Sequence, residues 1–390
     1  MNQLPKRLHS IDIYRAVTML LMIFVNDASG LKNIPAWIDH VAANSDGLGF
    51  ADTVFPAFLF IVGLSIPFAI TNRLKKGDAF LNVALYIVTR SAALLVMGFF
   101  HVNSEDYCTG ALLPRAVWII LSTIGFFMIW LDYSPSISNI KKHSLVGGGV
   151  ILLIAMALLY KGGDALAPHG MQPHWWGILG IIGWAYLVCA FVYLLTNGRL
   201  LLLITTWILF SAINIAAHTG MLPFKIWVIG DASSATLVMG GMVTAGIYQN
   251  IADKRKDALL WTLLTACGVI LIVAGFLIRP YAGGISKINA TPAWVFICSG
   301  ISLLANELMI WLIDINKKQQ WFSFIRPAGT STLTCYLLPY LLYALLHLLH
   351  FQYPALLSEG IAGLIRSFAI AFLIIWLTGI LEKYRLRVKI

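Results

Sequence analysis

The sequence predicts an all-α protein, a polytopic transmembrane bundle of about 10–12 spanning helices that forms one domain over residues 1–390. Three observations predict this fold. Hydrophobic residues make up 59% of the chain and charged residues only 11%, whereas soluble domains carry about 25% charged residues. Apolar windows long enough to cross a bilayer recur from end to end, and no low-complexity linker or short repeat divides them. Basic residues gather in alternate loops between these windows.

Each expected helix corresponds to one apolar window, because a span needs roughly 20 apolar residues. In order, the windows are 11–27, 51–71, 80–100, 112–131, 144–160, 176–196, 200–217, 234–250, 258–278, 292–314, 329–350 and 360–381. The two shortest, 144–160 and 200–217, meet the length requirement least well, so ten or eleven spans also fit the sequence.

The loop charges predict the orientation of the bundle. The net charge is +10. On the side that we assign to the cytoplasm, the loops carry Arg73, Lys75, Lys76, Lys141, Lys142, Arg199, Lys254, Arg255, Lys256, Lys317, Lys318 and Arg326, and the tail carries Lys383, Arg385, Arg387 and Lys389. The positive-inside rule therefore predicts an integral membrane protein with both termini in the cytoplasm. The same basic loops favour contact with anionic membrane lipid, and we expect no binding of nucleic acid.

The loop between the first two windows contains the strongest candidate site. Asn26 and Asp27 stand where this loop begins, His40 lies within it, and Asp52 opens the next window. Polar groups at the mouth of a membrane bundle are costly and usually functional. An unperturbed imidazole has a pKa of about 6.5, so His40 could exchange a proton near neutral pH or carry an acyl group as a nucleophile. Asp52 could orient that ring, or could be a first-turn acid favoured by the helix dipole.

Two arginines inside apolar windows are candidates for binding an anion. Arg90 lies in the middle of 80–100, where a guanidinium must face a cavity or a partner. It could form a structural ion pair or anchor a cofactor phosphate. Arg15 lies one turn into the first window, and could extend to lipid phosphate or join Arg73 and Lys76 in a phosphate site.

Polar residues on the expected outer side could line a substrate pocket. His101 ends the same window as Arg90, and Lys287 and Asn289 precede 292–314. They could equally be solvated surface residues. The chain has no HExxH, CxxC, GxxxxGK[ST] or GxSxG motif, so we expect no metal site and no phosphate-cradling loop.

Several motifs resemble a known family. The run SIDIYRAVTMLLMIFVND (10–27) resembles its opening span, and ADTVFPAFLFIVGLSI (51–66) resembles its second-span signature, with a histidine between the two. Further on, TRSAALLVMGFFHVN (89–103) is similar to its third span, and ISKINATPAW (285–294) to a later N-K-x-x-x-T-x-x-W element. The family is the heparan-alpha-glucosaminide N-acetyltransferase group of membrane acyltransferases, and the resemblance is most specific over 11–66.

This resemblance implies transfer of acetyl from cytoplasmic acetyl-CoA to an amino sugar or other glycan group on the extracytoplasmic side. We expect three sets of residues to carry the reaction. The catalytic residues are His40, Asp52 and Asn26; those for acetyl-CoA are Arg15, Arg90, Arg73 and Lys76; those for the acceptor are Asp27, His101, Lys287 and Asn289. A homodimer is among the expected assemblies.

The chain also departs from the family pattern. The family's R-G in the first span is Arg15-Ala16 here, the W-N-G-L-T tract before Asp52 is missing, and the G-V-L-Q-R element is not intact. These departures favour a divergent branch that acts on another sugar. We place it in a bacterial inner membrane, because the chain lacks the long luminal extension expected of a lysosomal relative. Two other functions fit the sequence: a transporter or flippase of a sugar or lipid-linked glycan, since Arg90 and Glu307 lie within spans, and a non-catalytic membrane scaffold.

Overall fold

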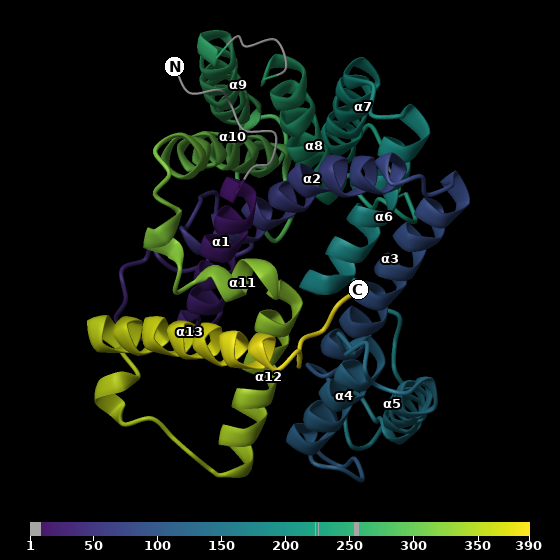
Figure 1. The fold of residues 1–390 in the computed structure, drawn as a ribbon. Helices are drawn as coiled ribbons and strands as arrows, with labels where there is room; N and C mark the ends of the chain where they lie inside the picture. Colours follow the sequence, from purple (N-terminus) through teal and green to yellow (C-terminus); the bar gives the residue numbers. More distant parts are fainter. Residues whose placement is uncertain (1–8, 223, 225, 253–256) are drawn as a thin grey trace.

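The computed structural model describes residues 9–222, 224, 226–252 and 257–390, and within these ranges it is built from helices without a named strand (Figure 1). Its helices are α1 (His9–Ala28), α2 (Ala51–Lys75), α3 (Phe80–Asn103), α4 (Arg115–Trp130), α5 (Asn139–Leu159), α6 (Ile178–Thr196), α7 (Leu200–His218), α8 (Ser233–Ala252), α9 (Asp257–Ile278), α10 (Pro292–Met309), α11 (Arg326–Thr330), α12 (Thr332–Leu348) and α13 (Gly360–Lys383). A π-helical turn, η1 (Ile310–Ile315), continues α10, and the short 3-10 turns η2 (Gln319–Phe322) and η3 (Ala355–Leu357) lie in loops. The basic run at 254–256 lies outside the described residues.

The predicted polytopic helical bundle is confirmed. Each of the twelve apolar windows coincides with a helix or a helix pair. Within the described ranges, eight helices are long and apolar enough to cross a membrane, and α4 and α12 are apolar but shorter. α1 is comparably long but includes the charged residues Asp12, Arg15 and Asp27.

The window 329–350 is not one continuous helix, because the chain bends at Ser331, whose φ and ψ are −125° and 44°. The short helix α11 before the bend packs tightly on α1. A Cβ at Gly329 would lie 2.2 Å from the carbonyl oxygen of Asp12, so only glycine allows this approach. The bend thereby brings the start of α12 close to Arg15, which donates to the carbonyl oxygen of Gly329 at 3.2 Å.

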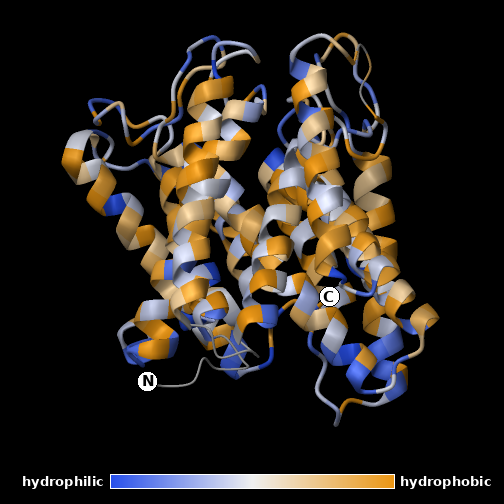
Figure 2. Cartoon of the chain, turned by 90° about the horizontal axis from the view of Figure 1, so that it is seen from above, coloured by the Kyte–Doolittle hydropathy of each residue, from blue (hydrophilic) through white to orange (hydrophobic). Residues whose placement is uncertain are grey.

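Contacts between loops show that successive spans run in opposite directions. The loop after α1 reaches the start of α13, where Asn33 donates to Glu359 at 2.8 Å, and it reaches the segment after α9 through Asp46 and Arg279 at 2.9 Å. At the opposite end, Asp132 after α4 pairs with Arg387 at 2.9 Å. We call these the His40 end and the Arg15 end. Figure 2 shows hydrophobic helix middles between two ends rich in hydrophilic residues.

α1 lies in the middle of the bundle in Figure 1, where it contacts α2, α10, α11, α12 and α13. α2 in turn crosses α8 closely: a Cβ at Gly63 would lie 1.9 Å from the carbonyl oxygen of Val238, and one at Gly241 would lie 2.0 Å from that of Phe60. Small residues allow such backbone contact between membrane helices. This packing fixes the middle of α2 against α8.

Candidate active site

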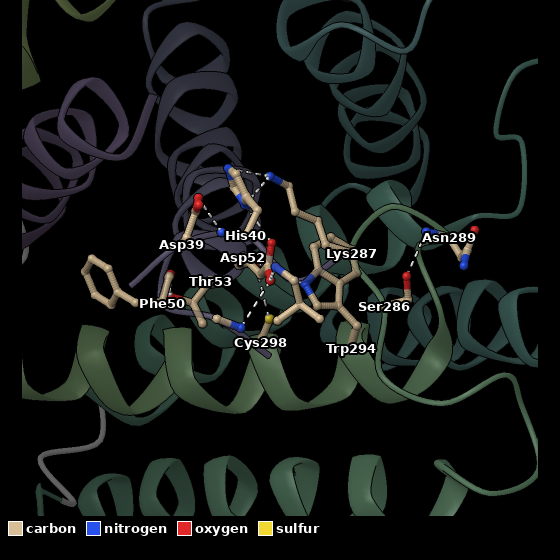
Figure 3. A network of polar contacts seen from close by, with 12 residues as sticks. Asp39, His40, Phe50, Asp52, Thr53, Ser286, Lys287, Asn289, Trp294 and Cys298 are labelled. Carbon is tan, nitrogen blue, oxygen red and sulfur yellow. Dashed lines mark hydrogen bonds and ion pairs between the residues drawn. The ribbon is translucent and has the colours of Figure 1, made fainter. Parts of the chain in front are cut away.

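His40 and Asp52 form a hydrogen-bonded pair at the His40 end (Figure 3). Nδ1 of His40 lies 2.7 Å from Oδ1 of Asp52, and the Asp52 side chain is only 2% exposed while that of His40 is 27% exposed. The second carboxylate oxygen, Oδ2, accepts the backbone N–H groups of Val41 and Gly49, each at 3.1 Å. Because an ionised carboxylate only accepts, Nδ1 carries the hydrogen of a neutral His40 and the lone pair lies on Nε2. Asp52 therefore fixes both the tautomer and the orientation of the ring.

The loop that carries His40 is folded around this carboxylate. A Cβ at Gly49 would lie 1.9 Å from the carbonyl oxygen of Asp39, so the loop can turn back onto Asp52 only with glycine there. On the other side, Trp294 of α10 donates its indole N–H to the carbonyl oxygen of Asp52 at 3.0 Å. The start of α2 is thus held from the loop and from α10.

Lys287 lies beside the His40 ring. Its Nζ is 3.2 Å from Nδ1 and 3.4 Å from Nε2 of His40. With Nδ1–H donated to Asp52, the ammonium has only Nε2 as an acceptor on the ring. Burial lowers the pKa of Lys287 below its ordinary value of 10.5, and the nearby Asp52 charge partly opposes that shift.

The segment with Lys287 is tied to the His40 loop through Asp46. Its carboxylate accepts the backbone N–H of Ile285 at 2.7 Å and the Nε–H of Arg279 at 2.9 Å. These two contacts, the first the larger, lower the pKa of Asp46. Asn289 adds a bond from its side chain to the carbonyl oxygen of Ala43 at 3.1 Å. This clamp places a lysine next to a histidine 247 positions away in the chain.

A cavity of about 1350 Å³ lies at the His40 end. Four of the predicted site residues line it together: Asn26, His40, His101 and Lys287. Aromatic residues that the sequence did not single out complete much of its wall, among them Trp175, Trp184, Tyr336 and Tyr340. Aromatic residues are common in apolar helices and at the membrane interface, so nothing in the sequence distinguishes these residues from core or interfacial ones.

A second cavity, of about 810 Å³, lies toward the Arg15 end. Arg15, Arg90 and Lys389 line it. Arg15 donates to Ser65 at 2.6 Å and to Asp12 at 3.1 Å, and Arg90 donates to the Tyr86 hydroxyl at 2.9 Å. The two cavities share four lining residues, Met22, Ile178, Leu179 and Tyr336, and so they meet there.

Other predicted residues lie outside the lining of both cavities. Asp27 faces α12 and α13: it pairs with Arg366 at 3.0 Å and accepts from Ser367 and Tyr343. Asn289 is part of the clamp just described. Their acceptor-binding roles stay predictions.

The two remaining basic residues proposed for acetyl-CoA belong to the Arg15 end. Arg73 pairs with Asp78 at 3.2 Å and stacks on the Tyr86 ring, with its guanidinium carbon 3.7 Å from the ring centroid. It therefore shares Tyr86 with Arg90. Lys76 caps the end of α2 and is exposed. Among the described residues, no group of three or more His, Cys, Asp or Glu could hold a metal ion.

Part of this chain resembles known proteins. Residues 7–174 match the family described as heparan-alpha-glucosaminide N-acetyltransferase, catalytic. Over these residues the chain is similar to that family. The match includes α1, α2, His40 and Asp52, and it confirms the resemblance drawn from the motifs.

Two N-acetyltransferases of the family give the extent of the likeness. The chain is 38% identical over 112 residues to heparan-alpha-glucosaminide N-acetyltransferase of Homo sapiens, and 39% identical over 106 residues to that of Mus musculus. These segments are 29% and 27% of this chain, but only 16% and 15% of the two relatives. The chain thus matches a small part of the length of either protein.

Proposed function

We propose that this protein transfers an acetyl group from acetyl-CoA, bound at the Arg15 end, to an amino sugar or another glycan group at the His40 end. The observation that supports this most is the pair of cavities that meet at Met22, Ile178, Leu179 and Tyr336. One cavity contains arginines suited to phosphate, and the other contains a carboxylate-oriented histidine. The cytoplasm then lies at the Arg15 end, as the loop charges predict.

The Arg15-end cavity suits the anionic part of acetyl-CoA. Arg90 has a buried Nε without a hydrogen-bond partner, so it has a donor left for a ligand. Guanidinium groups bind phosphate with two parallel hydrogen bonds, and do so most strongly where water is excluded. The pantetheine arm is uncharged and thin, so it can extend past the four shared residues toward His40 while the phosphates stay with Arg15, Arg90 and Lys389.

His40 can act in either of two ways. As a general base, Nε2 takes the proton of the acceptor amine or hydroxyl while that group attacks the thioester carbon, and coenzyme A leaves as a thiolate that is then protonated. As a nucleophile, Nε2 first forms an acetyl-imidazole with loss of coenzyme A, and the acceptor then attacks this acetyl group. In both cases Asp52 stabilises the positive ring, and the Lys287 ammonium with the Asn26 amide are donors for the oxyanion.

Transfer of radiolabelled acetyl from acetyl-CoA to glucosamine, with purified protein in detergent, tests the proposal. We expect His40→Ala to lose transfer by at least about a thousandfold, the scale of removing a central acid–base group. The matched control is His347→Ala, an exposed histidine that lines neither cavity. Full transfer by His40→Ala would refute the role of the imidazole.

The joined cavities also suit transport of a sugar or lipid-linked glycan, which is the alternative function. Uptake of labelled sugar into proteoliposomes without any acetyl transfer would favour the transporter and count against the enzyme. We therefore measure uptake and transfer on the same preparation.

A further inference from the structure

His101, near the end of α3, is a buried side chain with unused hydrogen-bonding capacity. It is 8% exposed, and neither ring nitrogen has a hydrogen-bond partner. A buried polar group without a hydrogen-bond partner destabilises the folded protein. Since His101 lines the His40-end cavity, a ligand in that cavity could provide the missing partner.

Aromatic contacts hold the His101 ring in place. It stacks on Tyr340 with ring centroids 4.0 Å apart and an interplanar angle of 6°, and its edge meets Phe126 at 5.7 Å. The hydroxyls of Tyr340 and Tyr336 are 3.1 Å apart. A single shared hydrogen bond leaves further donor and acceptor capacity on this pair. His101, Tyr336 and Tyr340 therefore form a rigid polar cluster on the α3 and α12 wall.

We propose that His101, Tyr336 and Tyr340 form the subsite that recognises hydroxyl groups of the acceptor sugar ring, an inference that rests on the proposed function. A neutral imidazole and two phenols offer both donors and acceptors, as sugar hydroxyls do. Trp175 and Trp184, with ring centroids 5.9 Å apart, line the same cavity and offer apolar faces for the ring. His101 and Tyr340 line only the His40-end cavity, so they face the acceptor rather than the phosphates of acetyl-CoA.

The charges of this cavity further limit the acceptor. Its lining includes the carboxylates of Glu105 and Asp231, whereas the lysine among its described lining residues is Lys287, which is beside His40. No arginine is among the described lining residues. A sulfated ring would meet carboxylates without an arginine to bind it. The subsite therefore suits a sugar with neutral hydroxyls or an amine, not a polyanionic one.

Kinetics with His101→Leu test the subsite. Loss of one or two hydrogen bonds to neutral groups, at about 0.5–1.5 kcal/mol each, predicts that KM for methyl glucosaminide rises about tenfold. KM for acetyl-CoA should stay within twofold, and His101→Gln, which keeps a donor and an acceptor, should recover part of the loss. The control is His169→Leu, at the same end but outside the cavity lining. An increase confined to KM for acetyl-CoA would overturn the assignment.

Two further measurements separate this inference from the proposed function. The wild-type protein should have a kcat/KM for methyl glucosaminide about tenfold or more above that for its 6-sulfate. A kcat/KM for the 6-sulfate that equals or exceeds that for methyl glucosaminide would overturn the inference. Binding of methyl glucosaminide without acetyl-CoA, followed by tryptophan fluorescence, requires no catalysis. If the wild-type protein binds the sugar but transfers no acetyl, and His101→Leu weakens that binding, the subsite is supported and the transferase function is refuted. No binding to the wild-type protein would overturn the subsite.

Discussion

Replacement of Asp52 by asparagine is the most informative single change at the site, because it removes a charge without removing volume. The carboxylate accepts hydrogen bonds from His40 Nδ1 and from the N–H groups of Val41 and Gly49. An amide has one oxygen, so Asp52→Asn must turn its NH2 group toward either the ring or the two backbone donors. If the NH2 group faces the backbone, the N–H groups lose their acceptor at a side chain that is only 2% exposed. If it faces the ring, Nδ1 must accept, and the hydrogen then lies on Nε2, which can no longer act as base or nucleophile.

The magnitude follows from these contacts. Hydrogen bonds to a charged group contribute about 1.5–3 kcal/mol each, and the Asp52–His40 bond strengthens when the ring becomes positive. A loss of about 3 kcal/mol in the transition state corresponds to about a 10²-fold decrease in kcat.

Radiolabelled acetyl transfer over a range of acetyl-CoA concentrations measures this effect. KM for acetyl-CoA should change less than threefold, because Asp52 lies outside the lining of the Arg15-end cavity. Asp106→Asn is the matched control, since Asp106 also pairs with a histidine, His169, at 3.2 Å but lines neither cavity. A kcat for Asp52→Asn within threefold of wild type would refute the positioning role.

Three further predictions concern the surroundings of this pair. If the Lys287 ammonium assists transfer, activity is complete at pH values below the lowered pKa of Lys287 and falls as pH rises through that pKa. Because an arginine keeps its charge, Lys287→Arg should stay active to higher pH. A pH–rate profile whose alkaline limb is the same in the variant and the wild type would contradict this prediction. Arg90→Gln should raise KM for acetyl-CoA by about 10- to 100-fold through loss of a charge-assisted phosphate contact. The control is Arg199→Gln, because Arg199 is exposed. A KM for acetyl-CoA that is the same in Arg90→Gln and the wild type would contradict this prediction. Asp46→Asn should lower kcat by about three- to tenfold, because the clamp that brings Lys287 to His40 loosens. In a double-mutant cycle, the effects of Asp46→Asn and Arg279→Gln on kcat should be coupled. Additive effects of the two substitutions would argue against the clamp.

The sequence predicts the helices well because membrane spans are specified locally, by the number of consecutive apolar residues. It does not predict the bend at Ser331 or the π-helical turn after α10, since these depend on the approach of Gly329 to α1 and on packing. The proximity of His40 and Asp52 was predictable because both belong to one short loop and the helix that follows it.

Long-range partners explain what the sequence does not predict. The sequence places Asp27 at the start of the His40 loop, whereas its partners Arg366 and Ser367 lie about 340 positions along the chain. Arg73 resembles a free basic residue until folding places it on the Tyr86 ring. Tyr336 and Tyr340 belong to an apolar helix by composition, and only the packing of α12 against α4 and α1 turns them toward a cavity.

Sidedness of transfer tests the central claim most directly. Proteoliposomes are loaded with a membrane-impermeant amino sugar and given radiolabelled acetyl-CoA outside; a second sample has both substrates outside only. If the donor and the acceptor reach His40 from opposite ends of the bundle, labelled product forms inside the loaded vesicles and the second sample stays inactive. Product formed only where both substrates share one side would contradict the two-cavity pathway.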